Sequence, residues 1–258
     1  MNRRNFLTAS LAAPALAAAA DEKSAPEYYE LRRYWLRSGP GRKLTDNYLR
    51  DALVPGLNRL GIQPVGVFSQ DIGEESPSMF VLIPAPTLDA LVGAQSKLEQ
   101  DTEYTRAAAD FLNTPAKEPA YERVESTLLR AFSGWPKMVV PPVTAEHGAR
   151  VFELRTYESP TDQDHRRKVE MFHSGEFEIF RKAGFWQVFF GDALIGPRLP
   201  RLTYMLSFAD AAERNKLWKA FSSDPDWKKL TASPRFSFED IVSNITNLML
   251  SPARYSQV

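Results

Sequence analysis

The sequence repeats itself without a gap at a constant spacing of 123 residues, seen in the step from Glu30 to Glu153. The segment ELRRY, which starts at Glu30, returns as ELRTY at Glu153. Turn glycines, a proline and strand residues recur at the same spacing: Gly61 and Gly184, Val65 and Val188, Ile72-Gly73 and Ile195-Gly196, Pro77 and Pro200, Asp101 and Asp224. Agreement at residues of such different kinds indicates two copies of one supersecondary unit. Positions where the copies differ in chemistry are therefore candidates for a function carried by one copy.

Each copy predicts the order strand, helix, strand, strand, helix, strand, from its apolar periodicity and its turn residues. In the first copy the expected elements are a strand at 28–35, a helix that carries Leu49, Leu53, Leu57 and Leu60 and stops at Gly61, strands at 62–68 and 78–83, a helical stretch from 88 through 104, and a strand at 121–131. In the second copy they are a strand at 150–157, a helix from Thr161 or Asp162 to Ala183 that stops at Gly184, strands at 185–190 and 201–208, a helical stretch from 211 through 227, and a strand at 240–250.

This element order is that of the ferredoxin-like fold, an α+β unit with helices on one face of an antiparallel sheet. The other face of such a sheet is apolar and needs a cover. The strand 185–190, FWQVFF, is apolar on both faces, as expected for a strand between helices and a second sheet. We therefore expect the two sheets to pair within one chain into an α/β barrel. The predicted domains are a signal at 1–20, repeats at 27–132 and 150–256, and a proline-rich linker at 133–149.

The first twenty residues are expected to be an export signal that takes no part in the fold. Arg3 and Arg4 precede an alanine-rich apolar run from Leu7 to Ala19, and small residues suit cleavage near Ala20. The paired arginines before a Phe-Leu step resemble a twin-arginine signal, and an ordinary secretory signal is the alternative. No later stretch approaches the ~20 apolar residues that span a bilayer. We predict a periplasmic or otherwise exported protein with no stable membrane insertion after cleavage.

Charge and cysteine content exclude several classes of protein. The chain has 32 basic and 32 acidic residues, and loss of Arg3 and Arg4 with the signal leaves it close to neutral. It therefore lacks the global positive field of nucleic-acid-binding proteins. The absence of cysteine excludes disulfides, thiolate metal sites and cysteine nucleophiles. The sequence also lacks a Walker loop and the G-x-G-x-x-G, H-E-x-x-H and G-x-S-x-G motifs.

The second copy resembles the NIPSNAP family over nearly all of residues 150–256. The similarity rests on the opening ELRTY strand, the helix end at Gly184-Phe185, the strand end at Phe190-Gly191, the strand LTYML at 202–206 and the motif DPDW at 224–227. The first copy, 28–131, is a weaker version with Tyr104 in place of Trp227. The resemblance implies the dimeric α/β-barrel superfold. It implies little about chemistry, because the family has no settled catalytic motif.

His173 and Glu176 are the catalytic candidates, because the two copies differ there. Glu176 stands on an apolar helical stripe where the first copy has Leu53, and His173 stands where it has Arg50. Side chains three residues apart meet on one side of a helix. A buried carboxylate beside an imidazole is suited to general acid–base chemistry. The alternative is that His173 lies in water and Glu176 forms a structural pair with a strand arginine.

The ligand-binding candidates are Arg155, Tyr157, Trp186, Tyr204 and Arg198. Arg155 would hold an anionic group. Its presence in both copies is explained most simply by an architectural role, in cross-strand ion pairs that fix the register between sheets. Aromatic strand residues are usually core, and an exposed loop arginine is usually solvated. We expect these residues to line a cavity between sheet and helices of the second repeat, together with the catalytic candidates.

The sequence thus predicts a protein that binds a small, partly aromatic molecule, with homo-oligomerisation optional. The alternatives are a non-enzymatic periplasmic interaction protein with an apolar patch beside Trp135, and a cofactor-free oxygenase or isomerase that uses His173 or Glu176 as base. No cofactor or metal is predicted. Haem ligation by His173 is suggested only by analogy with other members of the superfold.

Overall fold

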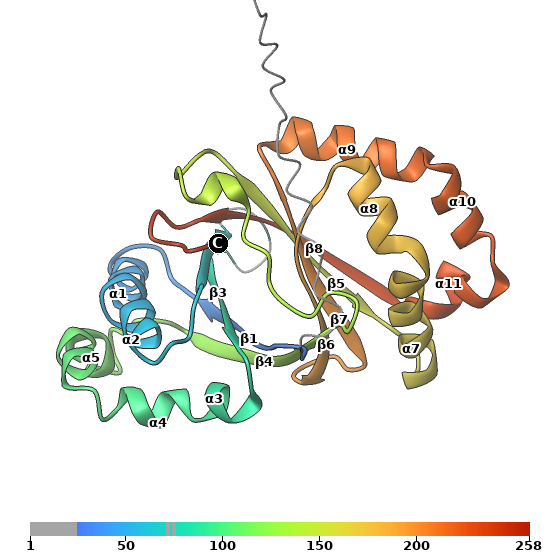
Figure 1. The fold of residues 1–258 in the computed structure, drawn as a ribbon. Coiled ribbons are helices and arrows are strands. Elements are labelled where there is room, and N and C mark those ends of the chain that lie inside the picture. Colours follow the sequence, from blue (N-terminus) through green and yellow to red (C-terminus); the bar gives the residue numbers. More distant parts are fainter. Residues whose placement is uncertain (1–24, 71–72, 74–75) are drawn as a thin grey trace, which may run out of the picture.

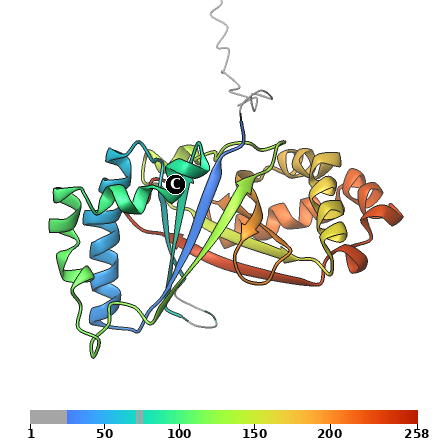
Figure 2. The ribbon, with the colours of Figure 1, turned by 90° about the horizontal axis from the view of Figure 1, so that it is seen from below.

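The computed structural model describes residues 25–258, except 71, 72, 74 and 75. Arg3, Arg4 and the rest of the predicted export signal lie outside these residues. Figure 1 shows a central sheet with one group of helices at each side, and Figure 2 shows the same two groups from below. In the part of the chain that is described, no helix combines the length and apolar character needed to cross a membrane.

The two repeats have the same order of elements. The first contains β1 (Tyr28–Trp35), α1 (Pro40–Tyr48), η1 (Leu49–Leu53), α2 (Val54–Arg59), β2 (Gly66–Gln70), β3 (Ser78–Ala85), α3 (Leu88–Val92), α4 (Ala94–Leu98), α5 (Thr102–Ala107), α6 (Ala109–Leu112) and β4 (Arg123–Ala131). The second contains β5 (Val151–Glu158), α7 (Asp162–Met171), η3 (Phe172–Glu176), α8 (Phe177–Ala183), β6 (Trp186–Ile195), β7 (Arg201–Phe208), α9 (Ala211–Ser223), α10 (Pro225–Thr231), η4 (Pro234–Phe236), α11 (Phe238–Ile241) and β8 (Asn244–Pro252). A short helix, η2 (Pro142–Thr144), lies between them.

The eight strands form one closed barrel in the order β1-β3-β2-β8-β5-β7-β6-β4. Each repeat contributes four adjacent strands, and the two four-stranded sheets join at β2–β8 and at β4–β6. The two junctions are equivalent, since each joins the second strand of one repeat to the last strand of the other. In the part of the chain that the structure describes, closure therefore gives every strand a neighbour on each side. The predicted pairing of two ferredoxin-like sheets within one chain is confirmed.

Three apolar clusters follow from this arrangement. One lies between the sheet and the helices of the first repeat, and a second lies in the same place in the second repeat. The third fills the barrel with side chains from both repeats, among them Tyr29, Phe68, Phe152 and Phe189. The strand alternation explains the division: Tyr29 and Leu31 point into the barrel, whereas Glu30 and Arg32 face the helices, because successive strand residues point to opposite faces.

The first helix of each repeat contains a π-helical turn at the same place. The turns are η1 and η3, and their bounds differ by the repeat spacing of 123 residues. Thr161 caps the start of α7 by accepting a hydrogen bond from the Asp164 amide, and Gly184 ends α8 in the left-handed conformation, with φ of 93°. These predicted helix ends are confirmed. The π turn was not predicted, because no residue pattern in the sequence marks it.

The segment that follows the last strand of each repeat forms a hydrogen bond with the first helix of the other repeat. Beyond β4, Gly134 donates its backbone N–H to Nε2 of His173, at 3.1 Å. Beyond β8, the hydroxyl of Tyr255 donates to Oδ1 of Asp46 in α1, at 2.7 Å. The linker itself runs along β6, where Val139 donates to the carbonyl of Val188. The two repeats are therefore held together by reciprocal contacts as well as by the strand junctions.

Candidate functional site

A glutamate, an arginine and a tyrosine occupy alternate positions on the opening strand of both repeats and face the helices. In the first repeat, Nε and Nη2 of Arg32 donate to the two carboxylate oxygens of Glu30, at 2.8 and 2.9 Å. Arg32 also donates to the hydroxyl of Tyr34, at 3.2 Å, and Ser126 donates to Glu30, at 2.8 Å. The side chains of Glu30 and Arg32 remain 19 % and 18 % exposed.

The same triplet in the second repeat is buried. Glu153 is 0 % exposed and accepts hydrogen bonds from Arg155, Arg214 and the indole N–H of Trp218. The guanidinium of Arg155 lies 4.5 Å from the centre of the Trp218 ring, within the range of a cation–π contact. The carboxylate therefore has two arginines and an indole around it, where Glu30 has one arginine and a hydroxyl.

Both glutamates are held in the ionised form. Burial alone raises the pKa of Glu30, but the hydrogen bonds and charge of Arg32 more than offset it, so the pKa is lowered. For Glu153, burial is again the largest influence and raises the pKa, yet Arg214, Arg155 and Trp218 together lower it below the ordinary value. The same neighbours leave the two carboxylates poorly suited to accept or deliver protons near neutral pH, because an effective acid–base group has a pKa near the working pH.

A cavity of about 420 Å³ lies over the triplet of the first repeat. Glu30, Arg32 and Ser126 form its polar end. Its apolar walls include Leu53, Leu57, Ile83, Leu91, Leu98 and Leu128. The second repeat contributes Ile195, which belongs to β6 and lies opposite Leu128 of β4 where the two sheets join. The volume lies within the range of small-molecule sites, which is about 300 to 1,000 Å³. As in such sites, most of the lining side chains are apolar.

The cavity exists in the first repeat because smaller side chains stand where the second repeat has large ones. The repeat spacing places Gln95 at the position of Trp218, and Leu91 at that of Arg214. It also places Leu57 and Leu98 at the positions of Phe180 and Phe221. In the second repeat these aromatic rings pack together, with Phe180 lying 5.8 Å from Trp218 and 4.5 Å from Phe221 between ring centres. In the second repeat these rings fill the space that corresponds to the first-repeat cavity.

His173 and Glu176 do not form the predicted pair. Glu176 is buried and its carboxylate accepts a hydrogen bond from Nζ of Lys168, at 2.7 Å. His173 is exposed, accepts from Gly134 at Nε2 and donates from Nδ1 to the carbonyl of Val169, at 2.9 Å. The π-helical turn separates them, because Gly175 within it has a φ of 152° and breaks the regular helical spacing on which the prediction relied. The partner of Glu176 is a helix lysine and not the strand arginine of the alternative interpretation.

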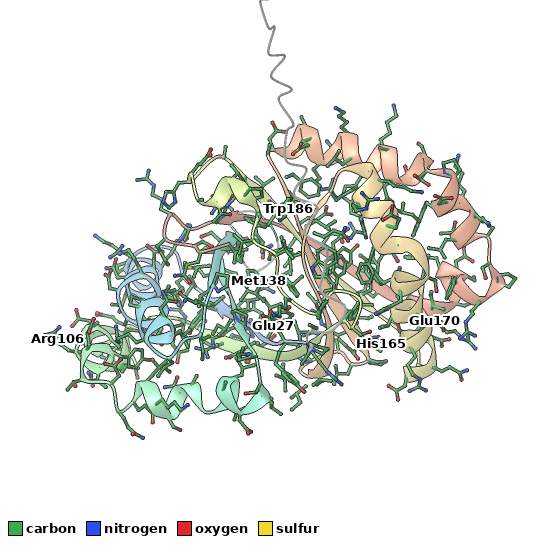
Figure 3. The ribbon with its side chains drawn as sticks, viewed as in Figure 1. Glu27, Arg106, Met138, His165, Glu170 and Trp186 are labelled. Carbon is green, nitrogen blue, oxygen red and sulfur yellow. The ribbon has the colours of Figure 1, made fainter. Side chains whose placement is uncertain are left out.

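The predicted ligand-binding residues do not surround one cavity. Arg155, Tyr157 and Tyr204 are buried and bonded to one another, with the tyrosine hydroxyls 3.1 Å apart. Trp186 lies beside the linker, where its indole N–H donates to the carbonyl of Val139 (Figure 3). Arg198 pairs with Glu158 at 3.3 Å and lines a separate cavity of about 950 Å³, together with residues of β2 and β8.

His173 does not fit the role of haem ligand that fold analogy suggested. Both ring nitrogens of His173 are engaged, one with a backbone N–H and the other with a backbone carbonyl. An axial ligand needs a free nitrogen directed at the iron. Within the described residues, His, Cys, Asp and Glu side chains form no group of three or more that could hold a metal ion.

Sequence reasoning did not single out Glu30 and Arg32 as candidate site residues. It treated the triplet as architectural because both repeats have it. The informative difference between the repeats is at another position, where the first repeat has Gln95 and the second has Trp218. The first triplet borders a cavity there, whereas Trp218 covers the second triplet. The exchange is visible at the repeat spacing, but its meaning depends on knowing that this helical position lies over the triplet.

The comparisons with known proteins agree with this fold. The model of the NIPSNAP family matches the chain twice, at residues 29–134 and 152–257. No curated protein matches the sequence. The structure is similar to that of a putative monooxygenase from Lactobacillus acidophilus NCFM, at 9 % identity, with 88 % of this chain and 94 % of that chain covered and a TM-score of 0.58.

Two further solved structures are similar in part or in whole. A putative monooxygenase from Fusobacterium nucleatum is 9 % identical, with 88 % of this chain and 93 % of that chain covered and a TM-score of 0.55. A NIPSNAP family protein of unknown function from Agrobacterium tumefaciens strain C58 is 17 % identical, with 42 % of this chain and 90 % of that chain covered and a TM-score of 0.36. At such low identity, the two similarities that cover most of the chain concern the fold alone.

Proposed function

The chain belongs to the NIPSNAP family, and from this premise we propose that it binds a small, mainly apolar molecule in the cavity of its first repeat. The cavity is the observation that carries the proposal: it is of ligand size, apolar along its walls and polar at one end. Apolar walls supply the free energy of binding, and a few polar groups fix the orientation of the ligand.

The polar end favours binding over acid–base catalysis. The pKa of Glu30 is lowered by Arg32 despite burial. Arg32 stays protonated, because Tyr34 and Glu30 raise its pKa although burial opposes them. Neither group is therefore poised for proton transfer near neutral pH. The similarity to putative monooxygenases extends to the fold and supplies no reacting group.

The proposal is tested by blocking the cavity from its mouth. Gln95→Trp places on α4 the residue that the second repeat has at this position. We expect wild-type protein to bind the neutral apolar fluorophore N-phenyl-1-naphthylamine, and the Q95W variant to lose at least about tenfold in affinity, which is about 1.4 kcal/mol.

The matched control is Ser96→Trp, which adds the same ring one residue further along α4 at an exposed position. We expect this variant to bind the fluorophore as the wild type does. Equal binding by the wild type and Q95W would contradict the proposal, since the probe would then bind elsewhere.

We further propose that the protein is exported by the twin-arginine route and acts in the periplasm. The support is the sequence of the first twenty residues, with Arg3 and Arg4 before a mildly apolar run. Replacement of both arginines by lysine is expected to leave the precursor in the cytoplasmic fraction. An unchanged periplasmic fraction would exclude this route.

A further inference from the structure

The indole of Trp218 contacts both charged residues of the triplet in the second repeat, Glu153 and Arg155. Its N–H donates to Oε2 of Glu153, at 2.7 Å, and its ring lies against the guanidinium of Arg155, at 4.5 Å. Phe180, Phe185 and Phe221 surround the ring, with distances of 5.0 to 5.8 Å between ring centres. In the second repeat, the group bound by this triplet is thus an aromatic ring that carries a hydrogen-bond donor.

The corresponding position in the first repeat is open. Gln95 occupies the equivalent helical position. Its side-chain amide donates to Glu99 one turn later, at 3.1 Å, and therefore does not cover the triplet. The equivalence of the two helices is close, because Thr87 and Asp210, 123 residues apart, cap their first turns. The cavity therefore lies where the second repeat holds the indole.

The first triplet retains unused hydrogen-bonding capacity toward this space. Oε2 of Glu30 accepts a single hydrogen bond among the described residues, from Arg32, whereas Oε2 of Glu153 accepts two, from Arg214 and Trp218. Arg32 uses three of its five N–H donors, two on Glu30 and one on Tyr34. Glu30 can accept from a ligand, and the face of Arg32 can stack on a ring.

On the basis of the proposed binding function, we propose that the ligand of the first-repeat cavity is a neutral planar aromatic molecule with a ring-borne N–H or O–H, of the indole or phenol type. Its donor binds Glu30 and its ring stacks on Arg32. Trp218 is the covalently attached counterpart of this ligand in the second repeat.

A neutral ligand is favoured over an anion because the polar end of the cavity is already balanced. Glu30 neutralises Arg32 through two hydrogen bonds, and the second arginine that accompanies Glu153 is replaced by Leu91. A carboxylate placed in the cavity would approach Glu30, and like charges at such distances repel.

The first experiment measures the affinity of the wild-type protein by titration calorimetry for matched pairs of probes. Indole is compared with 1-methylindole, and phenol with anisole, so that each pair differs in the donor. We expect each donor to bind at least about tenfold more tightly than its methylated partner, as expected for loss of one hydrogen bond to a charged group. Equal affinities within both pairs would overturn the inference and leave the proposed binding function intact.

The second experiment counts sites with indole in two variants that exchange the repeats at this position. Gln95→Trp is expected to reduce the stoichiometry from one to zero. Trp218→Gln is expected to raise it to two, because it opens the corresponding space in the second repeat. One remaining site in Q95W would overturn both the inference and the proposed location of binding.

If Trp218→Gln does not fold, the probe pairs and Q95W decide the inference without it. If it folds, indole is expected to raise its melting temperature more than that of the wild type, because the probe replaces a lost side chain at a second site. A folded W218Q variant with one site would overturn the claim that Trp218 acts as the counterpart of the ligand.

Discussion

Lys168 and Glu176 form an ion pair of 2.7 Å inside the second repeat, with side chains that are 1 % and 2 % exposed. The ammonium also lies 4.5 Å from the ring centre of Phe172. The first repeat folds without this pair, since it has Thr45 and Leu53 at the same positions. The pair is thus a property of one repeat and is not required by the shared fold.

Removing the lysine alone is expected to be costly. Lys168→Met leaves the carboxylate of Glu176 buried without a partner, and breaking a buried pair in this way typically costs about 3–5 kcal/mol. Burial raises the pKa of Glu176 even against the charge of Lys168. A group with a raised pKa in the folded state destabilises the protein as the pH rises through that pKa. Urea unfolding of K168M should therefore show a smaller loss at acidic pH than at neutral pH.

The matched control is the double variant Lys168→Thr with Glu176→Leu, which carries the residues of the first repeat. Replacement of a buried pair by uncharged residues is often neutral or stabilising. We expect the double variant to recover most of the stability that K168M loses. A double variant as unstable as K168M at neutral pH would contradict the assignment of the loss to the unpaired carboxylate.

The internal repeat made the fold predictable from the sequence. Comparison of the two copies also led to the prediction of a site at His173 and Glu176, which the structure does not form. Turn glycines such as Gly61 and Gly184 and the ELR strands carry local signals, and these were sufficient for the barrel. The pairing of His173 with Glu176 failed because it assumed regular helical spacing across Gly175, whose φ of 152° cannot be read from the sequence. The cavity is the result of side-chain volumes in three dimensions, and periodicity does not report volume.

Acid should destabilise the second repeat through Glu153. The folded-state pKa of this carboxyl is lowered by Arg214, Arg155 and Trp218, which outweigh burial. Its stabilising contribution is therefore complete above the unfolded pKa of about 4.3 and is lost as the pH falls through the lower folded pKa. We expect the free energy of unfolding to fall as the pH decreases below about 4.3, measured in the K168T/E176L background to remove the opposite contribution of Glu176.

Glu153→Gln is expected to cost about 3–5 kcal/mol at neutral pH, because two arginines lose their buried partner, and to flatten the acid dependence. Glu30→Gln is the matched variant in the first repeat. Glu30 is partly exposed and neutralises one arginine, so a smaller loss is expected. The account would be wrong if the two variants lost equal stability and kept the acid slope of the parent.

The reciprocal contacts between repeats should contribute independently to stability. Tyr255→Phe removes a hydroxyl that donates to Asp46, and His173→Phe removes the nitrogen that accepts from the Gly134 amide. Each variant is expected to lose about 1–2 kcal/mol. The contacts lie on opposite repeats, so the losses of stability should add in the double variant.

Hydrogen exchange should localise the effect of His173→Phe, with faster exchange of the Gly134 amide in H173F and an unchanged rate in Y255F. Tyr121→Phe is the control, because the hydroxyl of this exposed tyrosine forms no hydrogen bond among the described residues. A loss in Y121F equal to that in Y255F, or strongly non-additive losses, would show that the contacts do not fasten the two repeats separately.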